Sequence, residues 1–321
     1  MKMVSMCPIR SFAKDILALG LALLLSSCAM VESIRCLPHG EDSKFVGKWE
    51  TCFNNDDDGF KADSIAHPIY CFPGDPSQSS DRKPPVLLLH ELPGLSGKTL
   101  EYTRKLSQDF TVYVPLLFGK PNSQSNWHGF LITVGLNGEW RGVESGTSDV
   151  VPWLRAVVMK IEEAHPGQQI GVIGNCLTGS LPLALLGNQN IRAVVLAQPT
   201  LPLTIFDNSS EARSSLGISQ DEIAQAKQSS ARIFYLRFEQ DCVSKPEKRW
   251  KVWDLFTERG KFPDRVHKWV IPYEKQPVEH AHSTLIGEWR VGEFGKATND
   301  AREEVRRFLL DPVTFESTSE R

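Results

Sequence analysis

The stretch Ile170-Gly-Val-Ile-Gly-Asn-Cys-Leu-Thr-Gly179 decides how the rest of the chain is interpreted. Ile170 to Ile173 is a short, β-branched apolar run, which is typical of a buried strand. A glycine-framed turn follows at 174–179, and an apolar segment runs directly on from Ser180 to Leu186. Strand, sharp turn and helix in this order lift one side chain above the carboxyl edge of a parallel sheet, where it serves as a nucleophile. That side chain is Cys176; the alternative is a buried cysteine without a chemical role.

Strands and helices alternate on both sides of this stretch. Val86 to Leu89 is a continuous apolar run, as expected of a central strand that is covered on both faces. Apolar spacing predicts further strands at 110–114, 191–197, 233–238 and 266–271, and helices at 98–109, 150–165, 219–229, 247–257 and 301–310. The pattern predicts an α/β fold, with a mostly parallel sheet and helices on both faces.

Composition limits the classes of partner. The chain has 321 residues, of which 41% are hydrophobic and 23% charged, as in ordinary globular proteins. A formal net charge of -3 argues against a nucleic-acid partner. There is no CxxC pair or Cys/His cluster at metal-binding spacing, and the acidic turn 54–59 lacks the register of a calcium loop. We therefore expect no metal and no cofactor.

The N-terminus has the features of an export signal. Lys2, Arg10 and Lys14 precede the apolar run 16–25, which is too short to span a bilayer and suits the core of a signal peptide. The following Leu-Ser-Ser-Cys28 resembles the bacterial lipobox, in which the cysteine becomes the lipid-modified first residue. We expect a lipoprotein anchored through Cys28, facing the periplasm or cell exterior, and Ala29 favours the outer membrane. A short amphipathic leader or an early start codon is the alternative.

These features divide the chain into four parts. Residues 1–27 are the predicted signal peptide, 28–83 the anchor, spacer and N-terminal lead-in, 84–312 the α/β domain, and 313–321 a C-terminal tail. Cys36, Cys52 and Cys71 lie in the lead-in, where an oxidising compartment would permit a disulfide. Cys52–Cys71 is the pairing that we favour, and Cys242 is expected to be a buried thiol.

Polar side chains follow several of the predicted strands. Cys176, Asp241 and His282 come just after three of them, and Glu91 follows the strand 86–89. Because the carboxyl ends of parallel strands meet at one edge of a sheet, we expect these residues to share a site. His280 is an alternative to His282, and Glu239 is a weaker alternative to Asp241.

The chemistry of such a group is hydrolysis through a thiolate. His282 would take the proton of Cys176, and Asp241 would hold the imidazole in the required tautomer. A thiolate is itself a good leaving group, so the tetrahedral intermediate moves forward only if the substrate's leaving group is at least comparable. Enol esters, strained lactones, thioesters and activated esters meet this condition, whereas ordinary amides do not.

The order nucleophile, acid, histidine is that of the α/β-hydrolases, and the chain resembles the dienelactone hydrolase family within them. The resemblance lies in Leu89-His-Glu-Leu-Pro-Gly94, Gly174-Asn-Cys-Leu-Thr-Gly179, Gln240-Asp241 and Ala281-His-Ser283, and it covers about 84–310. It implies Cys176 as nucleophile, His282 as base, Asp241 as orienting acid and Glu91 as a carboxylate contacting the resting thiol. It also implies the backbone N–H groups of Leu92 and Leu177 as the oxyanion hole.

The sequence departs from the family archetype at two positions. Thr178 stands where the archetype has a second glycine. Ile286 stands where it has an arginine that contacts a substrate carboxylate, so a carboxylate-bearing substrate is not implied. Residues 116–148 are expected to pass over the site, with Trp127 and Trp140 serving as packing or as substrate platforms.

The sequence thus predicts an envelope-anchored hydrolase that cleaves a small-molecule ester, lactone or thioester. The main alternative is a catalytically weak lipoprotein that keeps the fold and binds a small molecule or a partner. A redox role for Cys176 with Cys242 lacks a CxxC motif. His90 is interpreted as structural. Substrate identity and oligomeric state are not determined by the sequence.

Overall fold

The structure is a computed structural model. It describes residues 49–53, 59–73, 83–92, 94–119, 121, 138–140, 142–202, 209–275, 281–286 and 293–316. The predicted signal peptide, the anchor Cys28, Trp127 and His280 lie outside these residues. None of the described helices is long and apolar enough to cross a membrane.

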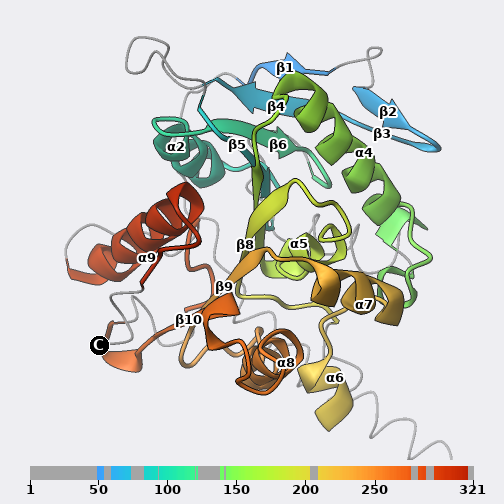
Figure 1. The fold of residues 1–321 in the computed structure, drawn as a ribbon. Coiled ribbons are helices and arrows are strands. Elements are labelled where there is room, and N and C mark those ends of the chain that lie inside the picture. The colour runs from blue at the N-terminus through green and yellow to red at the C-terminus, as the bar shows by residue number, and fades with distance from the viewer. Residues whose placement is uncertain are drawn as a thin grey trace, which may run out of the picture.

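An eight-stranded sheet forms the centre of the molecule (Figure 1). Its strand order is β1-β4-β6-β5-β7-β8-β9-β10. The bounds are β1 Thr51–Cys52, β4 Ile69–Phe72, β5 Pro85–Leu89, β6 Thr111–Pro115, β7 Ile170–Asn175, β8 Ile191–Ala197, β9 Arg232–Phe238 and β10 Val266–Ile271. The strands β6, β5, β7, β8, β9 and β10 are parallel to one another. At one edge β4 pairs antiparallel with β6, and β1 pairs antiparallel with β4. The predicted fold class is confirmed.

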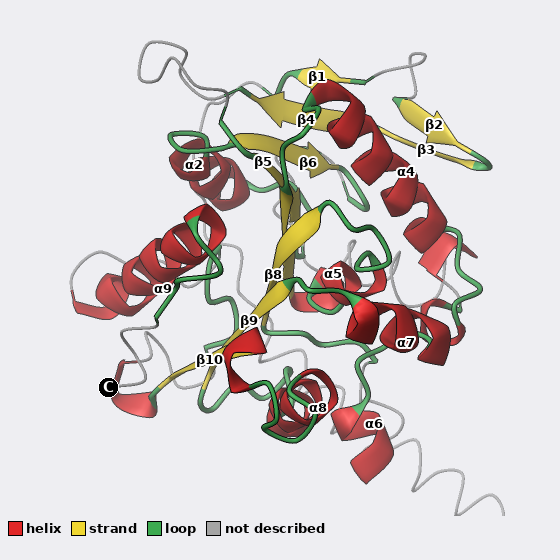
Figure 2. Ribbon diagram, in the orientation of Figure 1, coloured by secondary structure: helices red, strands yellow, loops and turns green. Residues whose placement is uncertain are grey.

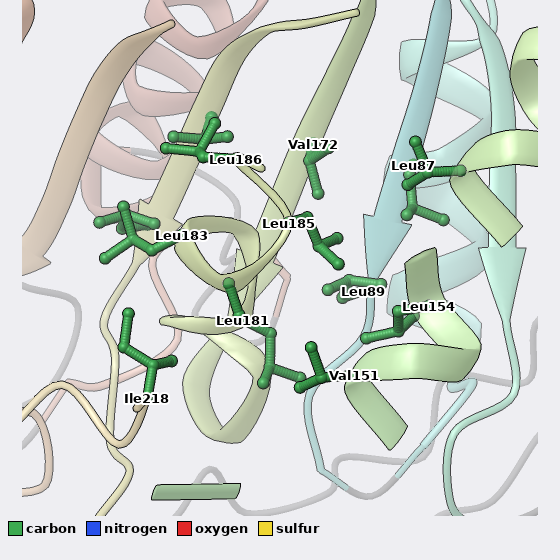
Figure 3. Close-up of a cluster of buried hydrophobic side chains, with 14 of the residues drawn as sticks. Leu87, Leu89, Val151, Leu154, Val172, Leu181, Leu183, Leu185, Leu186 and Ile218 are labelled. Carbon is green, nitrogen blue, oxygen red and sulfur yellow. The ribbon is translucent and has the colours of Figure 1, made fainter. Parts of the chain in front are cut away.

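Helices cover both faces of the sheet (Figure 2). Along β5 the side chains alternate: Leu87 and Leu89 belong to one buried cluster, and Val86 and Leu88 belong to the other. The helices α4 Val150–Ala164, α5 Leu181–Ala184, α7 Gln220–Gln228 and α8 Pro246–Phe256 contribute to the first cluster, part of which is shown in Figure 3. The helices α2 Gly97–Leu106 and α9 Glu293–Leu310 contribute to the second. A short helix, α6 Ser210–Ser214, precedes α7.

Helix ends follow their local sequence. A capping box opens α7: Ser219 Oγ accepts the N–H of Glu222 at 3.2 Å, and the Glu222 carboxylate accepts the N–H of Ser219 at 2.9 Å. By contrast, α9 begins at Glu293, eight residues before the predicted start at 301. The buried apolar residues described in its first turns, Ala297 and Ala301, are small, so the apolar periodicity that they give is weak.

The described part of the predicted lead-in joins the same sheet. Strands β1 and β4 extend its edge, and the disulfide Cys52–Cys71 links them with a Cα–Cα distance of 5.8 Å, which confirms the favoured pairing. A hairpin of β2 Phe60–Ala62 and β3 Ile65–His67 lies beside α4, where Trp153 Nε1 donates to the carbonyl of Phe60 at 3.1 Å. The N-terminal segment therefore completes the edge of the sheet on which the domain is built.

Candidate active site

Cys176 lies in a tight turn directly after β7, the elbow (residues 174–179). Its backbone has φ +54°, a left-handed conformation that non-glycine residues seldom adopt. The elbow leaves no room for side chains at its glycines: a Cβ on Gly174 would lie 2.3 Å from the carbonyl oxygen of Thr178, and one on Gly179 would lie 2.6 Å from Pro199 Cα. A short 3₁₀ turn, Cys176–Thr178, leads into α5. The structure therefore has the predicted order of strand, sharp turn and helix.

Thr178 explains why the elbow does not need a second glycine there. Its buried hydroxyl accepts the N–H of Asn175 at 2.9 Å and lies 3.1 Å and 3.2 Å from the carbonyl oxygens of Leu89 and His90. The side-chain amide of Asn175 also donates to Leu89 O, at 2.9 Å. These bonds join the elbow to the end of the neighbouring strand β5, and so fix where Cys176 lies relative to the loop after that strand.

Asp241 and His282 form a fully buried pair. Asp241 follows β9, His282 follows β10, and His282 Nδ1 lies 2.9 Å and 2.8 Å from the two carboxylate oxygens of Asp241. Both side chains have an exposed fraction of 0%. Asp241 Oδ1 also accepts the backbone N–H groups of Val243 at 2.9 Å and Ser244 at 2.8 Å. The carboxylate is thus held by the start of its own loop, and it orients the imidazole.

The surroundings of His282 favour its protonated form. Burial lowers the pKa of His282, but the charges of Asp241 and Cys176 and hydrogen bonds to both side chains act in the opposite direction. Their combined effect raises the pKa of His282 well above its usual value. Because Asp241 is bonded to Nδ1, Nε2 is the ring nitrogen left for an interaction with Cys176.

Thr200 is a neighbour of the thiol that sequence reasoning missed. Its hydroxyl lies 3.8 Å from Cys176 Sγ, and its N–H donates to the carbonyl of Cys176 at 3.1 Å. Thr200 is buried, and Cys176 has an exposed fraction of 2%. A threonine three residues beyond the end of a strand gives no sequence signal, because its contact with the thiol arises only when β8 lies beside β7.

Glu91 lies in the loop after β5, close to the residues that follow His282. It is buried, one carboxylate oxygen accepts the side-chain N–H of Gln198 at 3.0 Å, and the other accepts the hydroxyl of Ser283. The predicted oxyanion residues are buried as well: Leu92 follows Glu91, and Leu177 follows Cys176. Their two segments are adjacent, because Leu89 of β5 is in register with Gly174 of β7.

Three of the competing interpretations can be compared with the structure. Glu239 is exposed and accepts the N–H of Tyr273 at 2.8 Å, so its carboxylate serves a neighbouring turn. Trp140 is buried and makes an edge-to-face contact with Phe118, with 5.6 Å between the ring centres, as the packing interpretation requires. His90 is structural, as predicted.

His90 is neutral, and both ring nitrogens are bonded. Its Nδ1 donates to the carbonyl of Glu91 at 3.0 Å, and its Nε2 accepts the N–H of Leu117 at 3.0 Å. Burial, which outweighs the bond to Glu91, lowers the pKa of His90 to about 4. His90 therefore ties the loop after β5 to the segment after β6.

Cys242, the residue after Asp241, is disulfide-bonded, and its partner lies outside the described residues. The expectation of a buried free thiol was therefore wrong; the sequence alone gave no spacing that identified the pair. Within the described part of the chain, Cys176 is the one free cysteine. The same part contains no group of three or more Cys, His, Asp or Glu residues that could hold a metal ion.

Comparisons with known proteins identify the fold. The sequence matches no protein-family model and no curated protein. The structure is similar to that of a protein from Klebsiella pneumoniae subsp. pneumoniae MGH 78578 assigned as a dienelactone hydrolase, with a TM-score of 0.55, 15% identity, and coverage of 82% of this chain and 98% of that one. It is also similar to the Pyrococcus horikoshii acylaminoacyl peptidase, with a TM-score of 0.53, 12% identity, and coverage of 80% of this chain but only 41% of that one. At these identities the likeness concerns the fold, which is that of the α/β-hydrolases.

Proposed function

We propose that this protein hydrolyses a small carboxylic ester, lactone or thioester, with Cys176 as the nucleophile, His282 as the base and Asp241 as the orienting acid. The observation that carries the proposal is the buried Asp241–His282 pair, with Nδ1–Oδ distances of 2.8 and 2.9 Å, beside a cysteine in a left-handed turn at the same sheet edge. The α/β-hydrolase fold supports the reaction class, because its catalytic groups follow the carboxyl ends of the strands in this order.

The first chemical step is a proton transfer from Cys176 to His282. His282 takes the proton of the thiol, and the thiolate then attacks the substrate carbonyl. The C–S bond forms, and the carbonyl π electrons move to oxygen. The N–H groups of Leu92 and Leu177 would stabilise this oxyanion, and removing one such donor typically costs about 3 kcal/mol.

The second half of the cycle restores the thiolate. The oxyanion collapses, the bond to the leaving group breaks, and His282 gives its proton to the departing oxygen or sulfur. Neutral His282 then removes a proton from water, and the resulting hydroxide attacks the acyl thioester. Collapse of that intermediate releases the carboxylic acid and Cys176 thiolate, and His282 is again protonated.

The surroundings of the site favour a substrate with a neutral acyl group. Ile286 is four residues beyond His282, has an exposed fraction of 2% and belongs to the buried cluster under α2 and α9. It therefore offers no charge to a substrate carboxylate, in contrast to the arginine of the family archetype. We expect uncharged activated esters, lactones or thioesters to be better substrates than their carboxylate-bearing analogues.

We also propose that the enzyme is exported and held at the membrane through a lipid on Cys28. The support is the apolar run 16–25 followed by Leu-Ser-Ser-Cys28. Incorporation of labelled palmitate into the wild type, but not into Cys28→Ser, would be the expected result. Equal labelling of the two proteins would contradict it.

The function is tested by hydrolysis of p-nitrophenyl acetate. Wild type is compared with Cys176→Ala and His282→Gln, and with Lys296→Ala as a control, since that lysine has a side chain 74% exposed on α9. We expect kcat/KM to fall at least about 1,000-fold in both site variants and to stay within twofold in the control. Turnover by Cys176→Ala at the wild-type rate would refute the thiol mechanism. If the wild-type protein hydrolysed no ester, lactone or thioester, the proposed hydrolase function would be refuted.

A further inference from the structure

Gln198, the residue directly after β8, has an unusual backbone. Its φ is +37°, and its side chain is buried with an exposed fraction of 0%. Among the described non-glycine residues with positive φ, the others apart from Cys176 are exposed or half-buried: Phe53, Asp63, Glu258 and Arg259. A buried residue held in this sparsely populated conformation indicates that its surroundings enforce it, and such residues gather at functional sites.

The side-chain amide of Gln198 joins two loops of the site. Its Nε2 donates to a Glu91 carboxylate oxygen at 3.0 Å. Its Oε1 accepts the N–H of Thr284 at 3.3 Å and also the Thr284 hydroxyl. Its own N–H donates to Leu236 O at 2.8 Å, which fixes the backbone from which the amide extends. Gln198 therefore connects the loop after β5 with the loop that carries His282.

These contacts close into a ring. The Glu91 oxygen that does not face Gln198 accepts the hydroxyl of Ser283, and Ser283 is covalently joined to Thr284 on one side and to His282 on the other. Glu91, Gln198, Ser283 and Thr284 are all buried, with exposed fractions of 2%, 0%, 0% and 0%. Hydrogen bonds are stronger in such a site than in water, so each member constrains the others.

We propose that Gln198 is a positioning residue of the active site, which holds the Glu91 carboxylate and the His282 loop as one unit. This inference rests on the proposed function. Gln198 acts through Glu91 and through the residues after His282. Without its amide, the loops lose their common partner, and His282 shifts relative to Cys176. A displacement of about 1 Å at a catalytic group can cost about 100-fold in rate.

Four variants test the inference: Gln198→Met, Gln198→Glu, Glu91→Gln and the exchanged pair Glu91→Gln/Gln198→Glu. Methionine keeps the approximate volume but removes the amide. Glutamate at 198 places two carboxylates about 3 Å apart, where they repel or share a proton. In the exchanged pair the amide at position 91 donates to the carboxylate at position 198, so the direction of their hydrogen bond is reversed. Each side chain still has an oxygen that can accept the hydroxyl of Ser283 or Thr284.

We expect Gln198→Met to lower kcat about 10- to 100-fold with KM within threefold, and to shift the pH dependence of Cys176 alkylation by iodoacetamide. Thr103→Val is the matched control, because Thr103 is a buried residue on α2 whose hydroxyl bonds to Thr99 O of its own helix. It should lower the melting temperature without changing kcat or the alkylation profile.

The exchanged pair gives the decisive comparison. We expect its melting temperature to exceed that of Gln198→Glu by several degrees. The effects of the two single substitutions on the rate of Cys176 alkylation, multiplied together, give the rate for independent residues, and we expect the exchanged pair to react at least ten times faster than that. The inference would be overturned if the melting-temperature shift of the exchanged pair equalled the sum of the two single shifts, and if its alkylation rate lay within twofold of the product of the two single effects. That outcome is distinct from failure of the proposed function, because melting and alkylation report on Gln198 even if no ester is hydrolysed.

Discussion

The hydroxyl of Thr178 should contribute measurably to both the stability of the fold and the geometry of the nucleophile. Thr178→Val keeps the shape of the side chain but removes its oxygen. The buried N–H of Asn175, now 2.9 Å from Thr178 Oγ1, loses that acceptor, and the carbonyls of Leu89 and His90 lose a nearby donor. Leaving a buried group without its hydrogen bond costs about 1–3 kcal/mol. We therefore expect the free energy of unfolding to fall by about 2 kcal/mol, which corresponds to about 4–8 °C in melting temperature.

Thr178→Ser is the matched comparison. Serine keeps the hydroxyl and loses one methyl group, which costs about 1 kcal/mol. Thermal unfolding followed by circular dichroism and the kcat for p-nitrophenyl acetate should both rank wild type first, serine second and valine last, with kcat reduced about tenfold in Thr178→Val through a displaced Cys176. A valine variant equal to wild type, with serine the more damaging change, would show that volume and not hydrogen bonding holds the elbow.

Three further changes test other parts of the structure. Asp241→Asn should lower kcat about 1,000- to 10,000-fold, because an amide N–H facing Nδ1 forces His282 into the other tautomer; a fall of less than tenfold, measured on folded protein, would contradict this role. His90 should make stability fall as the solution becomes acidic: its pKa is about 4 in the fold and 6.5 when unfolded, so below pH 6.5 the unfolded chain binds the proton first. The stability advantage of wild type over His90→Asn, measured by urea unfolding, should therefore shrink by about 2 kcal/mol from pH 7 to pH 5, and a constant difference would argue against a neutral His90. Replacing Cys52 and Cys71 by serine should lower the free energy of unfolding by about 3 kcal/mol, because the disulfide closes a loop across a separation of 19 residues. It should leave kcat unchanged, because the two cysteines lie at the edge of the sheet. A large loss of kcat would show that this disulfide influences the active site.

The sheet and most helices could be predicted because their periodicity is local. The strands β5, β8, β9 and β10 begin and end within one residue of the expected positions. The start of α9 was missed because its first turns bury small residues such as Ala297, which give only a weak apolar pattern. The pairing of β4 with β6 was not predicted either, because Ile69–Phe72 is short and its partner strand lies about 40 residues further along the chain.

The candidate site also contains residues that could be predicted from the sequence and residues that could not. Cys176, Asp241 and His282 could be predicted to lie together because each follows a recognisable strand, and the order of the strands brings them to one edge. Gln198, Thr200 and the disulfide of Cys242 were not found. Their importance arises from contacts between residues far apart in the chain: Gln198 meets Glu91 across 107 positions. A single glutamine or threonine in a loop carries no pattern from which such a contact could be inferred.

The proposed mechanism and the disulfides place opposite demands on the redox conditions. In that mechanism Cys176 must remain a thiol, whereas Cys52, Cys71 and Cys242 are oxidised, and Cys242 adjoins Asp241, which is bonded to His282. A reductant added to preserve the nucleophile would also attack the bond that restrains the Asp241 loop. An oxidant that forms the disulfides would instead carry Cys176 towards a sulfenic acid. The burial of Cys176, at an exposed fraction of 2%, restricts the approach of both reagents and lets these two oxidation states of sulfur coexist in one molecule.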